Sequence, residues 1–395
     1  MPAVQGRGLR GGPGRRCLDV ARDVLVDPAD GRRSVRDGRD DDHRRAADAA
    51  TAAGPDAARC RTASVSRFPR RAFLKPAAAV LALSVLLSAP LLAEKPAPIS
   101  KLDPSPELDA FLAGVARDTV AEFSGAGLTE DGLSIAVIDL TAPTPVSSFP
   151  AGAYRGDQSY YPCSVVKLCF LSYYEAQKDA GKLADTSELV RAAKDMITVS
   201  SDDATGFVVD SITATTSGPE IMDAREWEKW KARRNVVNAY FRARGYTNLN
   251  ANQKTFCEDA YGREQAFREG DKNRNRMTAA EAARIFKEIE RGEVAGARLT
   301  EEMTTLLSRD ITGEKALEEM ELEDARLAGQ ELPKGSRLWA KSGDAYDFHH
   351  LVGRIALANG SDFVIAVFTK GVKTVPGIIP AVYGKVAAHF AARRP

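Results

Sequence analysis

The chain has 395 residues, of which 44% are hydrophobic, and its charges nearly balance, with 55 Lys and Arg against 54 Asp and Glu. This length permits one large domain or two smaller ones. A net charge close to zero gives no indication of binding to nucleic acid or to an anionic membrane surface, so we expect neither partner.

The first 93 residues predict a leader rather than a folded domain. Residues 1–66 are rich in Arg, Asp, Ala and Gly, and we expect a disordered leader or an over-extended start of the reading frame. In residues 67–93, Arg70-Arg71-Ala72-Phe73-Leu74-Lys75 precedes the apolar run Ala77–Leu92. This pattern predicts an export signal that resembles the bacterial twin-arginine signal; an ordinary secretory signal or an uncleaved membrane anchor are the alternatives. We therefore expect a periplasmic or secreted protein that meets the export machinery through residues 70–92.

Residues 94–104 are predicted to be a linker, because prolines recur there, and residues 105–395 to be one folded domain. The patterns predict, in chain order, a helix from Ser105, two strands, a helical block, three strands and a closing helix. The expected strands are Leu133–Leu140, Ala151–Tyr160, Arg337–Lys341, His350–Ala358 and Phe363–Lys370, and the later helical regions are 164–307 and Pro380–Arg393. Short connections between the last strands imply antiparallel neighbours. The expected fold class is α/β (α+β), with an antiparallel five-stranded sheet flanked by helices and a mainly helical subdomain.

Ser164 is the first candidate for chemistry. It follows Tyr160-Tyr161-Pro162-Cys163 and precedes an apolar run, which places it at a helix N-terminus. Free backbone N–H groups and the positive end of the helix dipole can stabilise an oxyanion there. Lys167 returns to the same helix face and can accept the serine proton if burial or a cationic neighbour keeps it neutral. The alternative is a capping serine followed by a solvated lysine.

Two later strings supply further polar groups. The hydroxyl of Ser201, in Ser201-Asp202-Asp203, could relay a proton to a leaving nitrogen, although a serine here could also simply cap a helix. Lys341-Ser342-Gly343 ends a predicted strand, where a cation and a hydroxyl can hold a carboxylate while the glycine lets the backbone approach. Its alternative is a basic strand end with a turn glycine.

With these three strings in this order, residues 105–393 resemble the class A β-lactamases and related penicillin-recognising serine hydrolases. The resemblance implies a β-lactamase/transpeptidase-like fold and the opening of a β-lactam amide through an acyl-serine intermediate. It implies a small-molecule or peptide substrate that bears a carboxylate, with no cofactor and no metal, and we expect a monomer. The implied roles are nucleophile for Ser164, base for Lys167, proton relay for Ser201, and carboxylate site for Lys341, Ser342 and Gly343.

The sequence departs from the family pattern at three places. Where the family usually has an asparagine that donates to the substrate amide, this chain has Asp203, and an ionised carboxylate cannot donate. The deacylating Glu-x-x-Leu-Asn pattern is absent from the sequence; Glu264 best fits that place, and Glu258 is the second candidate. His350 stands where many relatives have an arginine for the substrate carboxylate, so binding there would depend on pH. The alternative is a strand-edge histidine without a role in binding.

Other hydrolase classes are disfavoured. The only histidines after the leader are His349, His350 and His389, which lack metal-ligand spacing, and no Gly-x-Ser-x-Gly elbow occurs. Within the acyl-serine class, a D-alanyl-D-alanine peptidase or an esterase of the same fold is an alternative. Deacylation separates these readings within the class, since turnover needs a positioned carboxylate and water. A different class altogether is a non-catalytic penicillin-binding cell-wall domain that retains the fold.

Overall fold

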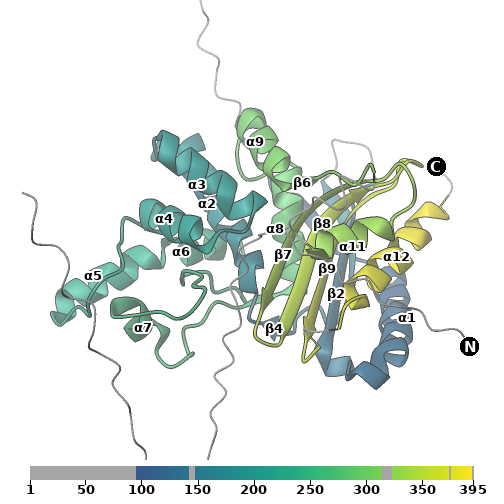
Figure 1. Ribbon diagram of the computed structural model, residues 1–395. Helices are drawn as coiled ribbons and strands as arrows, with labels where there is room; N and C mark the ends of the chain where they lie inside the picture. The colour runs from purple at the N-terminus through teal and green to yellow at the C-terminus, as the bar shows by residue number, and fades with distance from the viewer. Residues whose placement is uncertain (1–94, 142–146, 314–322, 373–374, 394–395) are drawn as a thin grey trace, which may run out of the picture. The chain divides into compact units, whose positions relative to one another are not determined.

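A seven-stranded sheet organises the computed structural model, which describes residues 95–141, 147–313, 323–372 and 375–393 (Figure 1). Its strands lie in the spatial order β1 (Lys101–Pro104), β3 (Ser148–Tyr154), β2 (Leu133–Asp139), β9 (Asp362–Lys370), β8 (Phe348–Ala356), β7 (Arg337–Ala345) and β6 (Ser308–Arg309). Neighbouring strands are antiparallel except β1 and β3, which are parallel. A separate pair joins β4 (Ser159–Tyr160) to β5 (Met277–Thr278).

The sheet therefore differs from the expected five-stranded antiparallel one. The five expected strands are present as β2, β3, β7, β8 and β9, but β1 and β6 extend the sheet at its two edges. β1 lies inside the stretch expected to be a linker, is mostly exposed and makes the parallel pairing. Both added strands are too short or too polar to carry an alternating apolar pattern, and they become strands because the free edges of the sheet offer backbone partners.

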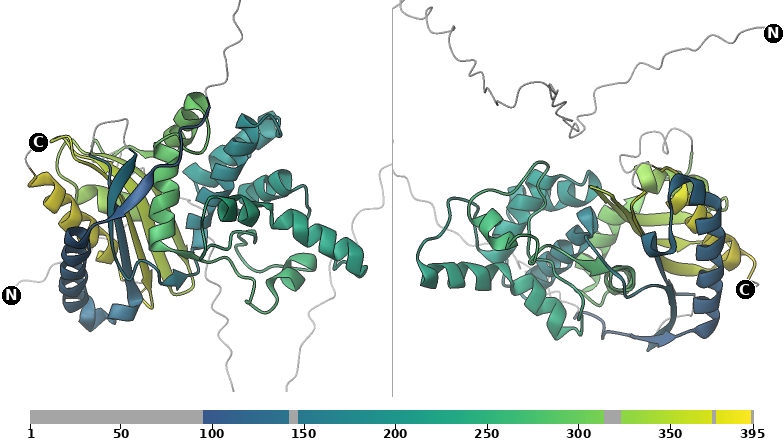
Figure 2. Two further views of the ribbon diagram at one scale, coloured as in Figure 1. Left: turned by 180° about the vertical axis from the view of Figure 1, so that it is seen from behind. Right: turned by 90° about the horizontal axis from the view of Figure 1, so that it is seen from below.

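The central strands are buried on both faces because their side chains alternate between two cores. In β9, one core takes Val364, Ala366 and Phe368, and the other takes Phe363, Ile365 and Val367. The first face is covered by α8 (Ala279–Glu290), and the second by α1 (Pro106–Phe123), α11 (Glu323–Gln330) and α12 (Ile378–Ala391) (Figures 1 and 2). The expected layering, a sheet with helices on both sides, is confirmed.

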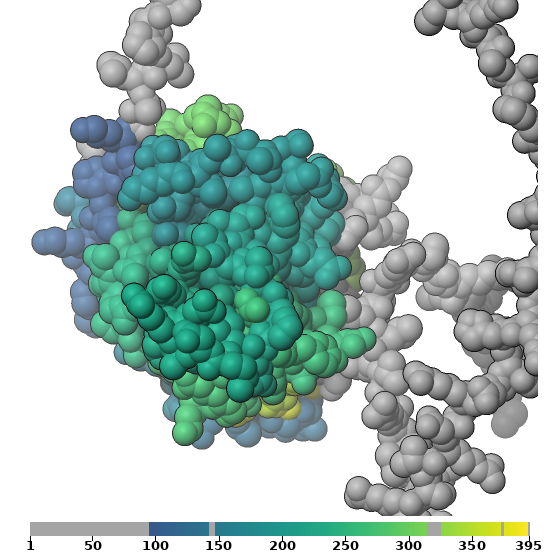
Figure 3. All heavy atoms as spheres, turned by 90° about the vertical axis from the view of Figure 1, so that its left-hand side faces the viewer, coloured from purple at the N-terminus to yellow at the C-terminus, as the bar shows by residue number. Residues whose placement is uncertain are grey.

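The helical block lies beyond α8 and presents the teal and green face in Figure 3. Its helices are α2 (Lys167–Asp179), α3 (Ser187–Thr198), α4 (Asp202–Thr213), α5 (Ala224–Arg234), α6 (Val236–Ala243), α7 (Arg263–Arg268) and α9 (Ala297–Leu307). Side-chain caps define several starts: Thr186 caps α3, Ser201 caps α4 and Asp223 caps α5.

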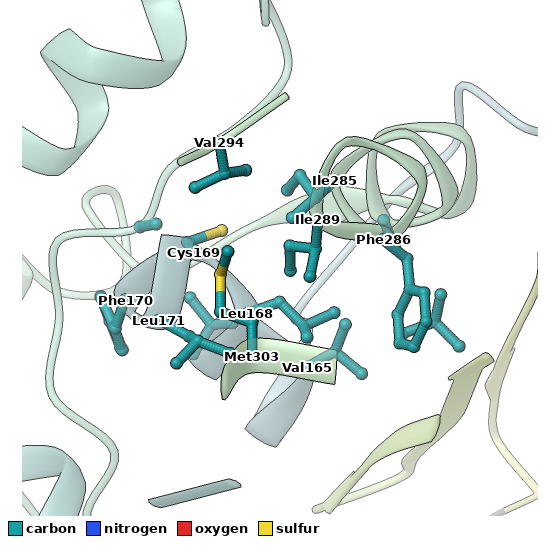
Figure 4. Close-up of a cluster of buried hydrophobic side chains, with 14 of the residues drawn as sticks. Val165, Leu168, Cys169, Phe170, Leu171, Ile285, Phe286, Ile289, Val294 and Met303 are labelled. Carbon is teal, nitrogen blue, oxygen red and sulfur yellow. The ribbon is translucent and has the colours of Figure 1, made fainter. Parts of the chain in front are cut away.

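A cluster of buried hydrophobic side chains fixes α2 between the sheet-covering helix α8 and α9 (Figure 4). Val165, Leu168 and Leu171 are fully buried against Ile289 of α8 and Met303 of α9, among others. Full burial of such side chains contributes roughly 1.5–3 kcal/mol each. This packing holds the first turn of α2, and therefore Ser164 and Lys167, at the boundary between the sheet and the helical block.

The predicted leader and export signal, residues 1–66 and 67–93, lie outside the described residues. Within the described part of the chain, no helix combines the length and apolar character needed to cross a membrane.

Candidate active site

Ser164 lies in a 3₁₀ turn, Cys163–Val166, that runs directly into α2. Val165 and Val166 are fully buried, so the turn is anchored while Ser164 remains partly exposed. Cys163, the residue before it, has a φ of 50°, an uncommon left-handed conformation for a side-chain-bearing residue. Such strained residues concentrate at functional sites, where surrounding packing maintains them. Ser164 therefore lies at the start of a helix, as the sequence predicts, and the left-handed Cys163 before it is a feature of the structure.

Gly343 on β7 lies against the backbone of this turn. A Cβ atom placed on Gly343 would be 2.9 Å from the Ser164 nitrogen and 2.7 Å from the Pro162 carbonyl oxygen. Real Cβ atoms are essentially never this close to backbone atoms, so only glycine permits the approach. The Lys341-Ser342-Gly343 string and the Ser164 turn are therefore brought together by tertiary packing.

Lys167 is fully buried and has three oxygen acceptors. Its Nζ donates to the Ser200 carbonyl at 2.6 Å, to the Ser200 Oγ at 3.1 Å and to the Asp202 Oδ1 at 2.7 Å. Burial lowers the pKa of Lys167, while the charge and hydrogen bond of Asp202 oppose that shift. Burial by itself would raise the pKa of Asp202, but the charge and hydrogen bond of Lys167 bring it below its usual value. The result is a buried ion pair in which burial and the Asp202 charge act on the pKa of Lys167 in opposite directions.

Ser200 provides the hydroxyl between the two lysines of the site. Its Oγ accepts from Lys341 Nζ at 2.9 Å and lies 3.1 Å from Lys167 Nζ. Lys341 is fully buried, and it also donates to the Ser342 carbonyl at 2.8 Å. The φ of Ser200 is 55°, the second left-handed residue in the site besides Cys163. One hydroxyl in contact with two ammonium groups can pass a proton between them or on to a substrate atom.

The hydroxyl that contacts both lysines therefore belongs to Ser200, one residue before the predicted Ser201. Ser201, expected to be the relay, caps α4 by accepting from the Ala204 backbone N–H at 3.1 Å. Asp203, expected at the substrate, is exposed on the first turn of α4. Ser200 and Asp202 face the lysines instead. The sequence holds a hint of this arrangement. A serine that caps a helix has its side chain engaged by the helix, so if Ser201 is the N-cap of α4, Ser200 is the serine whose hydroxyl remains for the site.

Glu264, expected to be the deacylating base, is held in a buried ion-pair network. Its two carboxylate oxygens accept from the Arg234 guanidinium at 3.0 and 2.8 Å, and Ser217 Oγ donates to Oε1 at 2.9 Å. Glu264 is 1% exposed and Arg234 is 0% exposed. Among the described residues, no hydrogen bond joins Glu264 to Ser164 or Lys167. Its hydrogen bonds to Arg234 and Ser217 hold neighbouring segments of the helical block together.

Arg234, at the end of α5, extends this network. The guanidinium approaches Asp210 Oδ1 at 3.3 Å and stacks over Trp230, 4.6 Å from the ring centroid. Lys254 donates to the other Asp210 oxygen at 2.6 Å. The network therefore ties α4, α5 and α7 to the chain around residue 254.

The loop that follows Lys254 borders the Lys167–Asp202 pair. Cys257 is exposed, and its Sγ lies 3.6 Å from Asp202 Oδ2. Glu258, the second deacylation candidate, is the next residue and is also exposed. A cavity of about 540 Å³ opens between this loop and residues 217–219, with Cys257, Glu258 and Glu264 in its wall.

His350 is fully buried on β8, opposite Gly343 in register. Its Nδ1 accepts from the Thr369 backbone N–H at 3.2 Å, so Nε2 carries the proton and donates to the Tyr161 carbonyl at 2.9 Å. The ring stacks on Phe368 with centroids 4.1 Å apart. Burial lowers the pKa of His350 to about 3. The ring is neutral with both nitrogens engaged, so it provides no titrating contact for a carboxylate, and the strand-histidine alternative fits this geometry.

The assembled centre contains two buried ammonium groups, a shared hydroxyl, a carboxylate and a partly exposed serine at a helix N-terminus. These groups can move protons and stabilise negative charge around a reacting carbonyl. Across the described ranges, no group of three or more His, Cys, Asp or Glu is arranged to hold a metal ion.

Comparison with known proteins identifies the family and the fold. A model of the beta-lactamase enzyme family matches residues 130–388. A beta-lactamase from Sphaerobacter thermophilus DSM 20745 is 16% identical, with a TM-score of 0.51 over 71% of this chain and 99% of that one. PBP-A is 16% identical, with a TM-score of 0.50 over 75% of this chain and 100% of that one. A PBP-A variant solved as an acyl-enzyme complex with penicillin G is 17% identical, with a TM-score of 0.50 over 75% of this chain and 100% of that one. At these identities the structures show a common fold. No curated protein sequence matches the chain.

Proposed function

Since this chain belongs to the beta-lactamase enzyme family, we propose that it is an exported serine acyl hydrolase that opens a β-lactam amide through an acyl-serine intermediate. The observation that carries the proposal is the contact of the Ser200 hydroxyl with both Lys167 and Lys341, beside the turn that bears Ser164. A solvated lysine or a plain helix cap would not require two buried ammonium groups to converge on one hydroxyl, because burying charge is costly unless it is paired.

In the acylation step, Ser164 Oγ attacks the carbonyl carbon and its proton passes to Lys167. The base must be neutral at that moment, and burial favours the neutral form by lowering the pKa of Lys167. The proton then passes through the Ser200 hydroxyl to the leaving nitrogen as the amide C–N bond breaks. We assign stabilisation of the oxyanion to the Ser164 backbone N–H, at the positive end of the helix.

The substrate carboxylate would be held by Lys341 and Ser342. Both belong to β7, and the close approach of Gly343 to the Ser164 turn sets the distance between this cation and the nucleophile. A buried ammonium is a strong partner for a carboxylate because little water competes for it. This supports a substrate whose carboxylate lies on the leaving-group side of the scissile bond.

Deacylation requires a water molecule and a general base. We assign Glu264 to structure, because both of its oxygens are engaged by Arg234. Glu258 is an exposed carboxylate of the neighbouring loop, and it lies next to Cys257, which contacts Asp202. We therefore expect acylation to be faster than hydrolysis, so that the acyl-enzyme accumulates.

The engagement of Glu264 also favours a second candidate of the same class. A D-alanyl-D-alanine peptidase or an esterase of the same fold would use the same Ser164 centre on a peptide or an ester bond. Such an enzyme differs from a β-lactamase in that its acyl-enzyme with a β-lactam persists.

The test is to mix the full chain with a chromogenic cephalosporin and to follow absorbance and intact mass together. A mass adduct that maps to Ser164 and is lost in Ser164→Ala supports the acyl-serine proposal. Rapid clearance of the adduct with turnover favours the β-lactamase, and persistence favours the slow acylating candidates. The absence of any adduct, together with absent turnover, would overturn the proposal.

Export is a separate part of the proposal. The basic and apolar string in residues 67–93 supports it, and so does the position of this string before the folded domain. Replacing Arg70 and Arg71 by lysine should retain the protein in the cytoplasm of a bacterial host, as judged by cell fractionation. Unchanged export would contradict the twin-arginine route.

A further inference from the structure

Arg274 packs against two tyrosine rings that come from distant parts of the chain. Its guanidinium carbon lies 4.2 Å from the centroid of the Tyr161 ring and 4.5 Å from that of the Tyr346 ring. The two rings are 5.8 Å apart and inclined by 67° to each other. An arginine cation over the face of an aromatic ring is attracted to it, so one side chain here ties two rings together.

Tyr161 belongs to the turn that carries the nucleophile. It lies three residues before Ser164, and its carbonyl accepts from His350 Nε2 at 2.9 Å. The Cys163 Sγ is 3.7 Å from this same carbonyl oxygen and 3.8 Å from the carbonyl oxygen of Ala345 at the end of β7. A displacement of Tyr161 would therefore reach the left-handed Cys163, which directly precedes Ser164.

Tyr346 lies in the turn between β7 and β8, directly after Ala345. Its φ is 57° and the residue is 60% exposed, so general burial does little to hold it. The same β7 strand carries Gly343, which approaches the backbone of Ser164. The packing of Tyr346 on Arg274 therefore acts at the end of the strand that borders the nucleophile.

The backbone of Arg274 is itself firmly held. Asn250 Nδ2 donates to the Arg274 carbonyl at 2.8 Å, and the side chain of Asn275 both accepts from the Gln253 backbone N–H and donates to its carbonyl, each at 2.9 Å. The guanidinium is also 3.4 Å from Asp271, whose side chain is 58% exposed, and ion pairs at such exposure contribute little. The two rings are therefore the main partners of a cation that projects from a fixed base.

The space beside this cluster is too small for part of a substrate. Tyr161, Arg274 and Tyr346 line one cavity with Gln253, Phe256 and other residues, and its volume is about 30 Å³. Such a volume holds about one or two water molecules. The cluster therefore suits a role in positioning the site more than a role in binding a ligand.

We propose that Arg274 is a positioning residue for acylation, which holds the Ser164 turn and the end of β7 in register by packing between Tyr161 and Tyr346. This inference rests on the proposed acylation of Ser164 and deepens it. A small displacement of a nucleophile slows its reaction strongly, because the attack needs an aligned approach to the carbonyl carbon. Loss of two cation–π contacts at a partly exposed site corresponds to a rate loss of about tenfold.

The experiment follows the acylation of the full chain by benzylpenicillin, with intact mass measured over a range of penicillin concentrations. This separates the dissociation constant of the first complex from the rate constant of acylation. Arg274→Met and Tyr346→Ala should each lower the rate constant about tenfold and change the dissociation constant by less than about twofold, because the proposed carboxylate site at Lys341 is left intact. Tyr346→Phe retains the ring and should retain the rate constant.

Arg291→Met is the matched control. Arg291 is also partly buried and lies over the Phe149 ring at 5.1 Å, but β3, which carries Phe149, is separated from β7 by β2, β9 and β8. We expect this variant to acylate at the unchanged rate. The double variant Arg274→Met/Tyr346→Ala should be no slower than the slower single variant, because both changes remove the same contact.

Unchanged rate constants in Arg274→Met and Tyr346→Ala, losses that multiply in the double variant, or an equal loss in Arg291→Met would overturn the inference and leave the acyl-serine proposal intact. A weaker first complex at an unchanged rate constant would also overturn it, because Arg274 would then act in binding. If the unchanged chain forms no adduct, the proposed function itself fails, and this inference fails with it.

Discussion

The ammonium of Lys167 donates to the carboxylate of Asp202 across 2.7 Å, with the lysine side chain fully buried. Two opposing effects therefore act on the proposed base: burial favours its neutral form and Asp202 favours its charged form. Acylation needs the neutral lysine, so the pair links the rate of acylation to pH.

Asp202→Asn should move the acidic limb of the acylation profile to lower pH. The rate falls when Lys167 becomes protonated, and removal of the Asp202 charge lowers the pKa of Lys167 further. The profile is measured with a single β-lactam by intact mass from pH 5 to pH 9, with Asp203→Asn as the control. An acidic limb that stays in place in Asp202→Asn would show that Lys167 is not the titrating base.

Ser200→Ala should slow acylation, whereas Ser201→Ala should lower the stability of the protein. Ser200→Ala removes the hydroxyl between the lysines and should slow acylation by about 10²–10³-fold, in the range of a lost general acid–base group. Ser201→Ala removes the N-cap of α4 and should cost about 1 kcal/mol of stability while acylation is retained. Acylation rates and thermal unfolding check both. If Ser201→Ala slows acylation and Ser200→Ala does not, Ser201 is the relay.

Glu264→Gln should destabilise the protein without selectively trapping the acyl-enzyme. It leaves the buried Arg234 charge with a weakened partner, which costs about 3–5 kcal/mol when a buried pair is broken. Glu258→Gln changes an exposed loop residue, and it should leave stability unchanged while slowing deacylation if Glu258 positions the water. Denaturant unfolding and adduct lifetime distinguish the two. A long-lived adduct in Glu264→Gln at unchanged stability would make Glu264 the deacylating base.

Gly343→Ala should slow acylation strongly. The added Cβ would lie within 2.9 Å of the Ser164 nitrogen, so β7 must move away from the nucleophile. Gly114→Ala, on α1, is a matched control, because a Cβ there has no neighbour within 4 Å and alanine favours a helix. Acylation kinetics on both variants are the measurement. Equal rates would show that the close approach is not needed for the reaction.

His350 should make the folded state less stable in acid. Its pKa is about 3 in the folded protein against 6.5 for the ordinary histidine, so the unfolded chain binds the proton first as pH falls. The stability that depends on neutral His350 is fully present above about pH 6.5. The free energy of unfolding should therefore fall by about 2 kcal/mol between pH 7 and pH 5. His350→Gln should reduce that decline, measured as the free energy of unfolding at the two pH values. An identical decline in the variant would assign it to other groups.

Regular local patterns explain why much of the fold could be predicted. The β2 and β9 strands carry long apolar runs, and α12 has a clear apolar face, so their positions followed from side-chain type. β1 and β6 were not predicted, because they are strands only by virtue of the sheet edges beside them. The position of Ser164 at a helix start also followed from local pattern.

The sequence alone determined that a serine and a lysine share one helix turn, because residues three apart on a helix face the same side whatever surrounds them. Only the tertiary structure decided which of two adjacent serines meets both lysines, since that depends on how α4 begins beside β7. It also decided that Glu264 belongs to Arg234, a residue 30 positions away in the chain. Ion pairs over such distances depend on packing, which no local pattern encodes.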